Sequence, residues 1–356
     1  MDNELEDDWL SFLENDCLTN ETKNEESKTE NIPKCSELYI STKTKNGSLN
    51  QNINLNEIFW KIPIIEYQEA KVGILKKQMK ISCLTVNESK ELDDKIKKEK
   101  YCHIDVITKI DDPNARKIKY KDVRKINIGL SKKDLTSFRT KKKGAFYNCF
   151  VIIVRVLDNN DEFKEIHVKL FNTGKVEIPG IKEDSILDKT MELVIEILQP
   201  FFKKELKLNN KNFNTSLVNS NFTCNHNINR DEMARILKYK YKLGVVFDPC
   251  SYPGIQCKFY YHPDASTNNG VQDDTLVKKD SKNNWSEISF MIFRTGSVLI
   301  VGKCNREVLD IIYNFLVKII TTEYKEISLG LNKVKKEKKK TKVRKRTIIF
   351  TTQKSN

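Results

Sequence analysis

Hydrophobic and polar positions follow the same order twice along this chain. Short runs rich in β-branched and aromatic residues, HVKLF and EISFMIF, predict strands. Each run leads into Thr-Gly, a second apolar run and a second glycine, an order typical of a tight hairpin. Beyond each hairpin the apolar positions recur with the 3.6-residue period of an amphipathic helix. The pattern therefore predicts two copies of a hairpin followed by a helix.

The two copies are also similar residue by residue. FNTGKVEIPG (171–180) recurs 122 residues later as FRTGSVLIVG (293–302), with six of the ten positions identical. The helix patterns continue in the same register, and Pro200 is expected to end the first helix. The apolar helix positions are 186, 187, 191, 193, 194, 197 and 198, and 308, 309, 312, 315, 316, 319 and 320. An internal duplication of this length fixes the architecture before any residue is given a role.

Other segments extend each repeat to a larger unit. The nearly continuous apolar run CFVIIVRVL (149–157) predicts a central strand, and Asn229 with Glu232 resembles a capping box at the start of a helix. Further strands are predicted in KQMKISCLTV (77–86), VNSNFTCNHN (218–227), LGVVFDPC and SYPGIQCKFYY, and a polar helix in NESKELDDKIKKEK. Each repeat thus contains a strand, a helix, several antiparallel strands and a second helix, which is an α+β fold.

The domain organisation follows from these repeats and from changes in composition. We expect an acidic, mostly disordered N-terminal segment, two repeats and a basic tail. The predicted ranges are 1–56 for the acidic segment, 57–208 for the first repeat with an irregular insertion at about 101–145, 209–330 for the second repeat with an insertion at about 262–284, and 331–356 for the tail.

Charge is distributed unevenly along the chain. The net charge is +14, while residues 1–30 carry eleven acidic and two basic side chains and residues 331–356 carry eleven Lys or Arg and one Glu. Both ends contain too little apolar surface to fold alone. About +13 remains on the central part, which predicts an anionic partner, with nucleic acid the leading candidate.

The cysteines do not form a recognisable metal or disulfide framework. Nine are present without a CxxC pair, and a reduced, intracellular compartment is expected. The loose group Cys224, His226, Cys250, Cys257 and His262 has the residue types of a zinc site without its spacing, so buried thiols are the preferred interpretation. We expect no bound metal and no membrane-spanning segment.

Catalysis has little support in the sequence. The four histidines, His103, His167, His226 and His262, are not paired with a nucleophile or a metal-ligand motif at a useful spacing. No glycine-rich phosphate loop is present. We therefore expect no catalytic residues, no cofactor and no enzymatic activity.

At this point the motifs resemble those of the TATA-box-binding protein family. KLFNTGKVEIPGIK and MIFRTGSVLIVGKC resemble the family hairpin IF-x-SGK-x-V-x-TGAK, FDPCSYPGIQCKF resembles EPELFPGLIYRM, and VNSNFTC resembles QNIVGSC. The resemblance implies a two-repeat saddle, in which a curved antiparallel sheet carries helices on its convex face. Large insertions, charged tails and abundant Lys, Asn and Ile are similar to the divergent versions encoded by nucleocytoplasmic large DNA viruses.

The resemblance also implies a function and partners. It implies a transcription initiation factor that binds the minor groove of A/T-rich promoter DNA and bends it by inserting aromatic wedges. Its partners would be double-stranded DNA and RNA polymerase or general transcription factors. A viral version would act in the host cytoplasm or the virion, and the basic tail is also compatible with the nucleus.

The aromatic wedges are carried over by position. Phe171 and Phe293 match the hairpin wedges of the two repeats. Tyr252, before Pro-Gly, matches the other wedge of the second repeat, although the family has phenylalanine there. Phe150 is the preferred match in the first repeat, with Phe146 as the alternative.

The polar contacts are carried over in the same way. Asn219 matches the central asparagine of the second repeat, whereas the first repeat has Lys80 or a neighbour there. Arg155, Lys175 and Lys258 match the rim positions that meet phosphates.

Several positions depart from the family pattern. Glu177 replaces an apolar residue of the sheet face, Pro179 and Val301 replace threonines, and Ser297 replaces a rim lysine. They motivate an alternative function, a protein-interaction scaffold of a viral transcription complex that has lost sequence-specific DNA binding. A nucleic-acid-processing enzyme is a third possibility, and the absence of a second domain of catalytic size argues against it.

Overall fold

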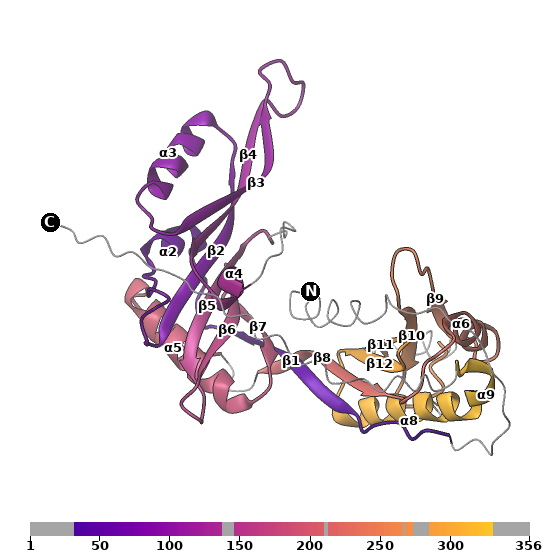
Figure 1. Cartoon of the computed structure of the whole chain (residues 1–356). Coiled ribbons are helices and arrows are strands. Elements are labelled where there is room, and N and C mark those ends of the chain that lie inside the picture. The colour runs from indigo at the N-terminus through magenta and orange to yellow at the C-terminus, as the bar shows by residue number, and fades with distance from the viewer. Residues whose placement is uncertain (1–31, 137–145, 210–212, 266–267, 273–284, 330–356) are drawn as a thin grey trace. The chain divides into compact units, whose positions relative to one another are not determined.

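The computed structural model describes residues 32–136, 146–209, 213–265, 268–272 and 285–329. Residues 1–31 of the predicted acidic segment (1–56) and the basic tail lie outside these ranges, so the predictions for them stay predictions, whereas residues 39–48 of that segment form a strand. The chain divides into two compact units (Figure 1). We call residues 46–214 with 334–356 the first-repeat unit, and residues 1–45 with 215–333 the second-repeat unit.

The first-repeat unit contains an antiparallel sheet with helices on one side. Its strands lie in the order β3-β4-β2-β5-β6-β7. The elements are α2 (Leu55–Lys61), β2 (Gly73–Cys83), α3 (Val86–Ile96), β3 (Cys102–Asp111), β4 (Tyr120–Gly129), α4 (Lys132–Thr136), β5 (Cys149–Leu157), β6 (Phe163–Phe171), β7 (Lys175–Ile181), α5 (Asp184–Leu198) and a 3₁₀ turn (Gln199–Phe201).

The second-repeat unit has the same design with a shorter sheet. Strand β1 (Tyr39–Ser48) runs through the boundary between the units, and the order is β1-β8-β12-β11-β10-β9. The other elements are β8 (Asn214–Thr223), α6 (Arg230–Tyr239), β9 (Gly244–Val246), β10 (Ile255–Tyr261), β11 (Ser286–Ile292), β12 (Ser297–Gly302), α8 (Arg306–Thr322) and α9 (Tyr324–Ile327). In Figure 1, α8 lies along the strands of this unit.

The two hairpin turns use glycine for the same reason. Gly174 and Gly296 have φ angles of +78° and +80°, the left-handed region that favours glycine. A Cβ atom at Gly174 would collide with the carbonyl oxygen of Gln51, and one at Gly296 with that of His226. The predicted Thr-Gly turns are therefore confirmed.

The first strand and first helix of each repeat also match. Asn54 accepts a hydrogen bond from the backbone N–H of Glu57, and Asn229 accepts one from that of Glu232, so both cap a helix N-terminus. These caps lie 175 positions apart, whereas the hairpins lie 122 apart. The difference of 53 residues falls between the first helix and the hairpin of the first repeat, where α3, β3, β4 and α4 lie.

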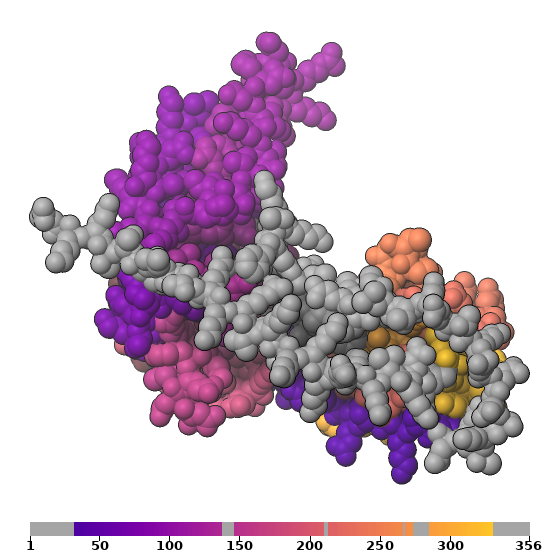
Figure 2. All heavy atoms as spheres, viewed as in Figure 1, coloured from indigo at the N-terminus to yellow at the C-terminus, as the bar shows by residue number. Residues whose placement is uncertain are grey.

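Two parts of the first repeat differ from the prediction. Its first strand is β1, not the segment 77–86, which forms most of β2. Strand β1 has the sequence YISTKTKNGS, whose polar character hides it from a search for apolar runs. Residues 102–136, expected to be irregular, form β3, β4 and α4, and the turn between β3 and β4 projects from the unit (Figure 2).

Each unit packs one face of its sheet against its helices. Phe59, Phe150 and Val194 belong to the core of the first-repeat unit, and Phe290 and Ile312 to that of the second. The apolar stripes predicted for α5 and α8 face these cores. The α+β class and the two-repeat architecture are confirmed. We call the sheet face away from the helices the open face of each unit.

Candidate nucleic-acid interface

The open face of the second-repeat unit is mostly uncharged. One row across it joins Asn221 on β8, Leu299 on β12, Met291 on β11 and Gln256 on β10, which are successive cross-strand partners. All four are partly or fully exposed, because their neighbours in sequence point into the helix-side core. A ligand at this face would therefore meet apolar side chains and amides.

Two aromatic rings stand at the end of this face. The ring centroids of Tyr252 and Phe293 lie 6.2 Å apart with the planes at 65°. Gly254 makes the contact feasible, since a Cβ there would come within 2.8 Å of Phe293 and 3.0 Å of Tyr252. Phe293 is 2 % exposed and Tyr252 is half-buried, and burial raises the pKa of the Tyr252 phenol.

Strand register identifies the equivalent of Tyr252 in the first repeat. In the first repeat, Phe171 on β6 is the cross-strand partner of Cys149 on β5. In the second repeat, extending the β10–β11 register by one residue places Phe293 opposite Gly254, so Cys149 and Gly254 are equivalent. Tyr252 is two residues before Gly254, so its equivalent is Tyr147, two residues before Cys149. Tyr147 is 56 % exposed.

Phe150 lies on the other side of the sheet. It is the register equivalent of Ile255, is 0 % exposed, and packs edge-to-face on Phe59 with centroids 5.4 Å apart. The structure thus places Phe150 in the helix-side core and the alternative, Phe146, at the surface with 56 % exposure. Tyr147 lies two residues before Cys149, as Tyr252 lies two residues before Gly254, but this equivalence can be recognised only when the strand pairing of both hairpins is known.

Asn219, the predicted central amide contact, lies on β8, the first strand of the second repeat. Asn219 is 9 % exposed, its Nδ2 donates to Thr42 Oγ1 at 3.1 Å, and its Oδ1 has no hydrogen-bond partner among the described residues. The spacing of 175 residues gives Thr44 as its equivalent, rather than Lys80, which lies on β2. The same spacing matches Asn46 with Asn221.

The three predicted rim cations have different surroundings. Arg155 is buried, donates to the backbone oxygens of Glu69 (2.6 Å) and Tyr67 (2.9 Å), and so contributes to folding of the first-repeat unit. Lys258 forms an ion pair of 2.7 Å with Glu287, which raises the pKa of its ammonium group. Lys175 is exposed, 5.9 Å from the centre of the Phe171 ring.

The open face of the first-repeat unit is charged at the positions where the second is apolar. Lys169 and Glu177 are cross-strand partners joined by an ion pair of 2.8 Å. Their equivalents, 122 positions later, are the partners Met291 and Leu299. An ion pair needs a compensated environment, and covering it with DNA would remove its water. The two open faces therefore differ in chemistry at equivalent positions.

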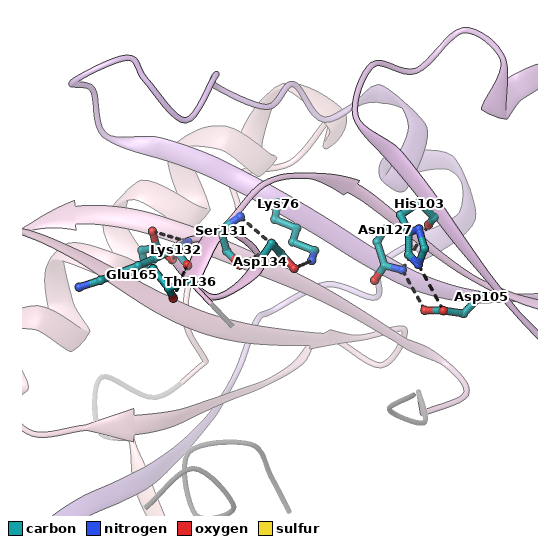
Figure 3. A network of polar contacts seen from close by, with 9 residues as sticks. All are labelled: Lys76, His103, Asp105, Asn127, Ser131, Lys132, Asp134, Thr136 and Glu165. Carbon is teal, nitrogen blue, oxygen red and sulfur yellow. Dashed lines mark hydrogen bonds and ion pairs between the residues drawn. The ribbon is translucent and has the colours of Figure 1, made fainter. Parts of the chain in front are cut away.

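A short helix also lies against this face of the first-repeat unit. Asp134 on α4 accepts from Lys76 Nζ at 2.6 Å, and the backbone N–H of Lys132 donates to both carboxylate oxygens of Glu165, at 3.1 and 3.0 Å (Figure 3). Burial raises the pKa of Asp134, but hydrogen bonds from Lys76 and Ser131 outweigh it and the net pKa lies below its usual value. Burial raises the pKa of Glu165.

The described residues give no sign of a metal centre or a membrane span. No three His, Cys, Asp or Glu side chains among them are grouped to hold a metal ion. Within the same ranges, no helix is both long and apolar enough to cross a bilayer.

Two hairpin–helix repeats, each with an antiparallel sheet that packs one face against its long helix, define the class of fold. No protein-family model matches the chain. It is 24 % identical over 306 residues to a protein of Acanthamoeba polyphaga mimivirus described as TATA-box-binding protein-like, covering 80 % of this chain and 75 % of that one. The resemblance to the TATA-box-binding protein family, in its divergent viral form, is confirmed.

Methanococcus jannaschii TBP aligns with a TM-score of 0.38 at 13 % identity, over 82 % of this chain and 99 % of that chain.

Proposed function

We propose that this protein is a transcription initiation factor that binds the minor groove of A/T-rich promoter DNA and bends it. The observation that carries the proposal is the mostly uncharged open face of the second-repeat unit, with Tyr252 and Phe293 paired at its end. Apolar side chains and amides suit a minor groove, where only hydrogen-bond acceptors line A·T pairs. Rings at the end of such a face can enter a base step and kink the duplex.

The first repeat would contribute a weaker half of the same interface. Phe171 and Tyr147 are its proposed wedges, by strand register with Phe293 and Tyr252. Lys175 and Lys258 are proposed phosphate contacts, and Asn219 is a proposed base-edge contact near the start of the repeats. The proposed activity is binding without catalysis, in the compartment that holds the promoter, with RNA polymerase or general transcription factors as protein partners.

The test is energy transfer between dyes at the two ends of an A/T-rich duplex. The wild-type protein should raise the transfer, and its affinity should fall with salt because phosphate contacts release counterions. Phe293→Ala should abolish the kink. Tyr239→Ala, which removes a 62 % exposed ring at the end of α6 in the same unit, is the matched control and should bend DNA normally. Absence of bending at low salt at every protein concentration would refute the proposal.

A second function is favoured by one specific observation. The Lys169–Glu177 ion pair and α4 make the first open face a poor minor-groove surface. A scaffold that recruits transcription proteins without reading DNA would have no need of an apolar first face. Co-purification with such proteins, together with no shift of an A/T-rich duplex, would favour this alternative.

A further inference from the structure

The described ends of the connection between β4 and β5 lie over the open face of the first-repeat unit. In the sheet, β2 lies between these two strands and pairs with both. The described ends of the connection contact β2 and β6 on the open face, while the helix side is filled by the core beneath α2, α3 and α5. Its described parts are residues 130–136, which include α4, and residues 146–148.

The first part of the connection is attached to two strands. Lys76 Nζ, on β2, donates to Asp134 at 2.6 Å, and Glu165, on β6, accepts from the backbone N–H of Lys132 (Figure 3). Asp134 is held in place by Ser131, whose N–H and Oγ donate to it at 2.8 and 2.6 Å. These contacts bridge β5, which lies between β2 and β6.

The second part is attached to the same two strands. Lys80 Nζ, on β2, lies 3.4 Å from the centre of the Tyr147 ring. Lys169 Nζ, on β6, lies 5.3 Å from the centre of the Phe146 ring. Such cation–π contacts are attractive, and both rings consequently lie back on the face of their own sheet. We call α4 with Phe146 and Tyr147 the cover.

The cover occupies groups that DNA would use. Asp134 holds the ammonium group of Lys76, whose side chain is only 9 % exposed, and a phosphate would compete for the same cation. Tyr147, a proposed wedge, rests on Lys80. Among the described residues of the second-repeat unit, the connection before β10 joins the adjacent strands β9 and β10 and has no need to cross the sheet.

We propose that the cover is an autoinhibitory element that competes with DNA for the open face of the first repeat. This inference rests on the proposed DNA-binding function. DNA binds the uncovered state, so its apparent dissociation constant is the intrinsic value divided by the uncovered fraction. Weakening the cover therefore tightens DNA binding without adding any contact to DNA.

Two variants test the proposal in the full chain, each with its own control. Asp134→Asn removes the ion pair, and Asp188→Asn on the exposed face of α5 makes the same change of charge elsewhere in the unit. Lys132→Pro removes the N–H that Glu165 accepts at the first position of α4, where proline is tolerated. Lys132→Ala loses the same charge and keeps that N–H.

The readout is affinity for a short A/T-rich duplex at fixed salt, with bending followed in parallel. Each variant should bind about three- to tenfold more tightly than its control. Hydrogen exchange at the Lys132 amide should also accelerate when DNA is added to the wild type. Wild-type binding and bending, with both variants equal to their controls, would overturn the cover and leave the proposed function standing. No binding by any form would overturn both.

Discussion

The two open faces of this protein share one backbone plan and differ in chemistry. At the same cross-strand position the second-repeat unit has Met291 and Leu299, whereas the first has Lys169 and Glu177. The helix α4 also lies over the first face. The two repeats therefore share the turns, caps and core that folding requires, while their open faces differ in chemistry. On the proposed function, the open face of the second repeat would therefore bind DNA more strongly than that of the first.

The largest expected effect separates two neighbouring aromatic residues of the first repeat. Phe150→Ala should destabilise the first-repeat unit by about 3–5 kcal/mol, because it empties a fully buried site against Phe59. Tyr147→Ala, at an exposed position, should change stability by less than about 0.5 kcal/mol. Chemical denaturation of both variants measures the difference. Equal losses of stability would contradict the assignment of the two residues to opposite faces.

The next largest effect is on DNA affinity, when the charged pair of the first open face is introduced into the second. Met291→Lys with Leu299→Glu gives the second face the ion pair of the first, and DNA affinity should fall by about a hundredfold, since the buried pair would lose its water. Binding of an A/T-rich duplex at fixed salt measures it.

The reciprocal exchange is the control for this comparison. Lys169→Met with Glu177→Leu should raise affinity, while Lys169→Glu with Glu177→Lys keeps the ion pair and should have little effect. A fall in affinity after the apolar exchange would refute the view that charge weakens the first face.

The smallest effect is a difference in pH dependence between the units. Burial lowers the pKa of His226, more than its hydrogen bond to the Cys224 carbonyl raises it. The unfolded chain binds the proton more readily, so the stability of the second-repeat unit should be constant above about pH 7 and decrease below about pH 6.5, by at most about 1.4 kcal/mol per pH unit. The equivalent residue of the first repeat, Gln51, does not titrate.

Hydrogen exchange of amides in β8 and β12 at pH 7.5 and 5.5 measures this dependence. His226→Gln, which copies the first repeat, should flatten it. The neighbouring Cys224 has no part in this pH range, because burial raises the pKa of its thiol. An unchanged pH dependence in the variant would assign the effect to another group.

Much of the fold could be predicted because its signals are local. Each correctly predicted feature is encoded by residues that lie close together in the sequence. These features are the Thr-Gly turns, the apolar stripes of α5 and α8, the Asn229 cap and the apolar run of β5. Strand β1 escaped prediction because its polar sequence leaves no apolar pattern. The strands β3 and β4 were missed in a lysine-rich stretch for a similar reason.

The candidate site was less predictable because faces depend on register. A shift of one residue moves a side chain to the other face of a sheet. Phe150 therefore points into the core, whereas its neighbour Cys149 pairs with the open-face residue Phe171. Arg155 has the residue type of a phosphate contact, yet the carbonyl groups of Tyr67 and Glu69 hold it inside the unit. Both partners lie more than 80 residues away in the chain, so no local sequence pattern around Arg155 reveals these hydrogen bonds.

The sequence by itself determined that this protein is a duplication, which segments form its turns and main helices, and which family it resembles. These properties depend on periodicity and on residue types at short spacing. Only the tertiary structure decided which aromatic residues reach the open faces, that β1 begins the first repeat, and that α4 lies over the first face. The reason is that strand pairing joins residues far apart in the chain, and pairing sets the side on which each residue lies.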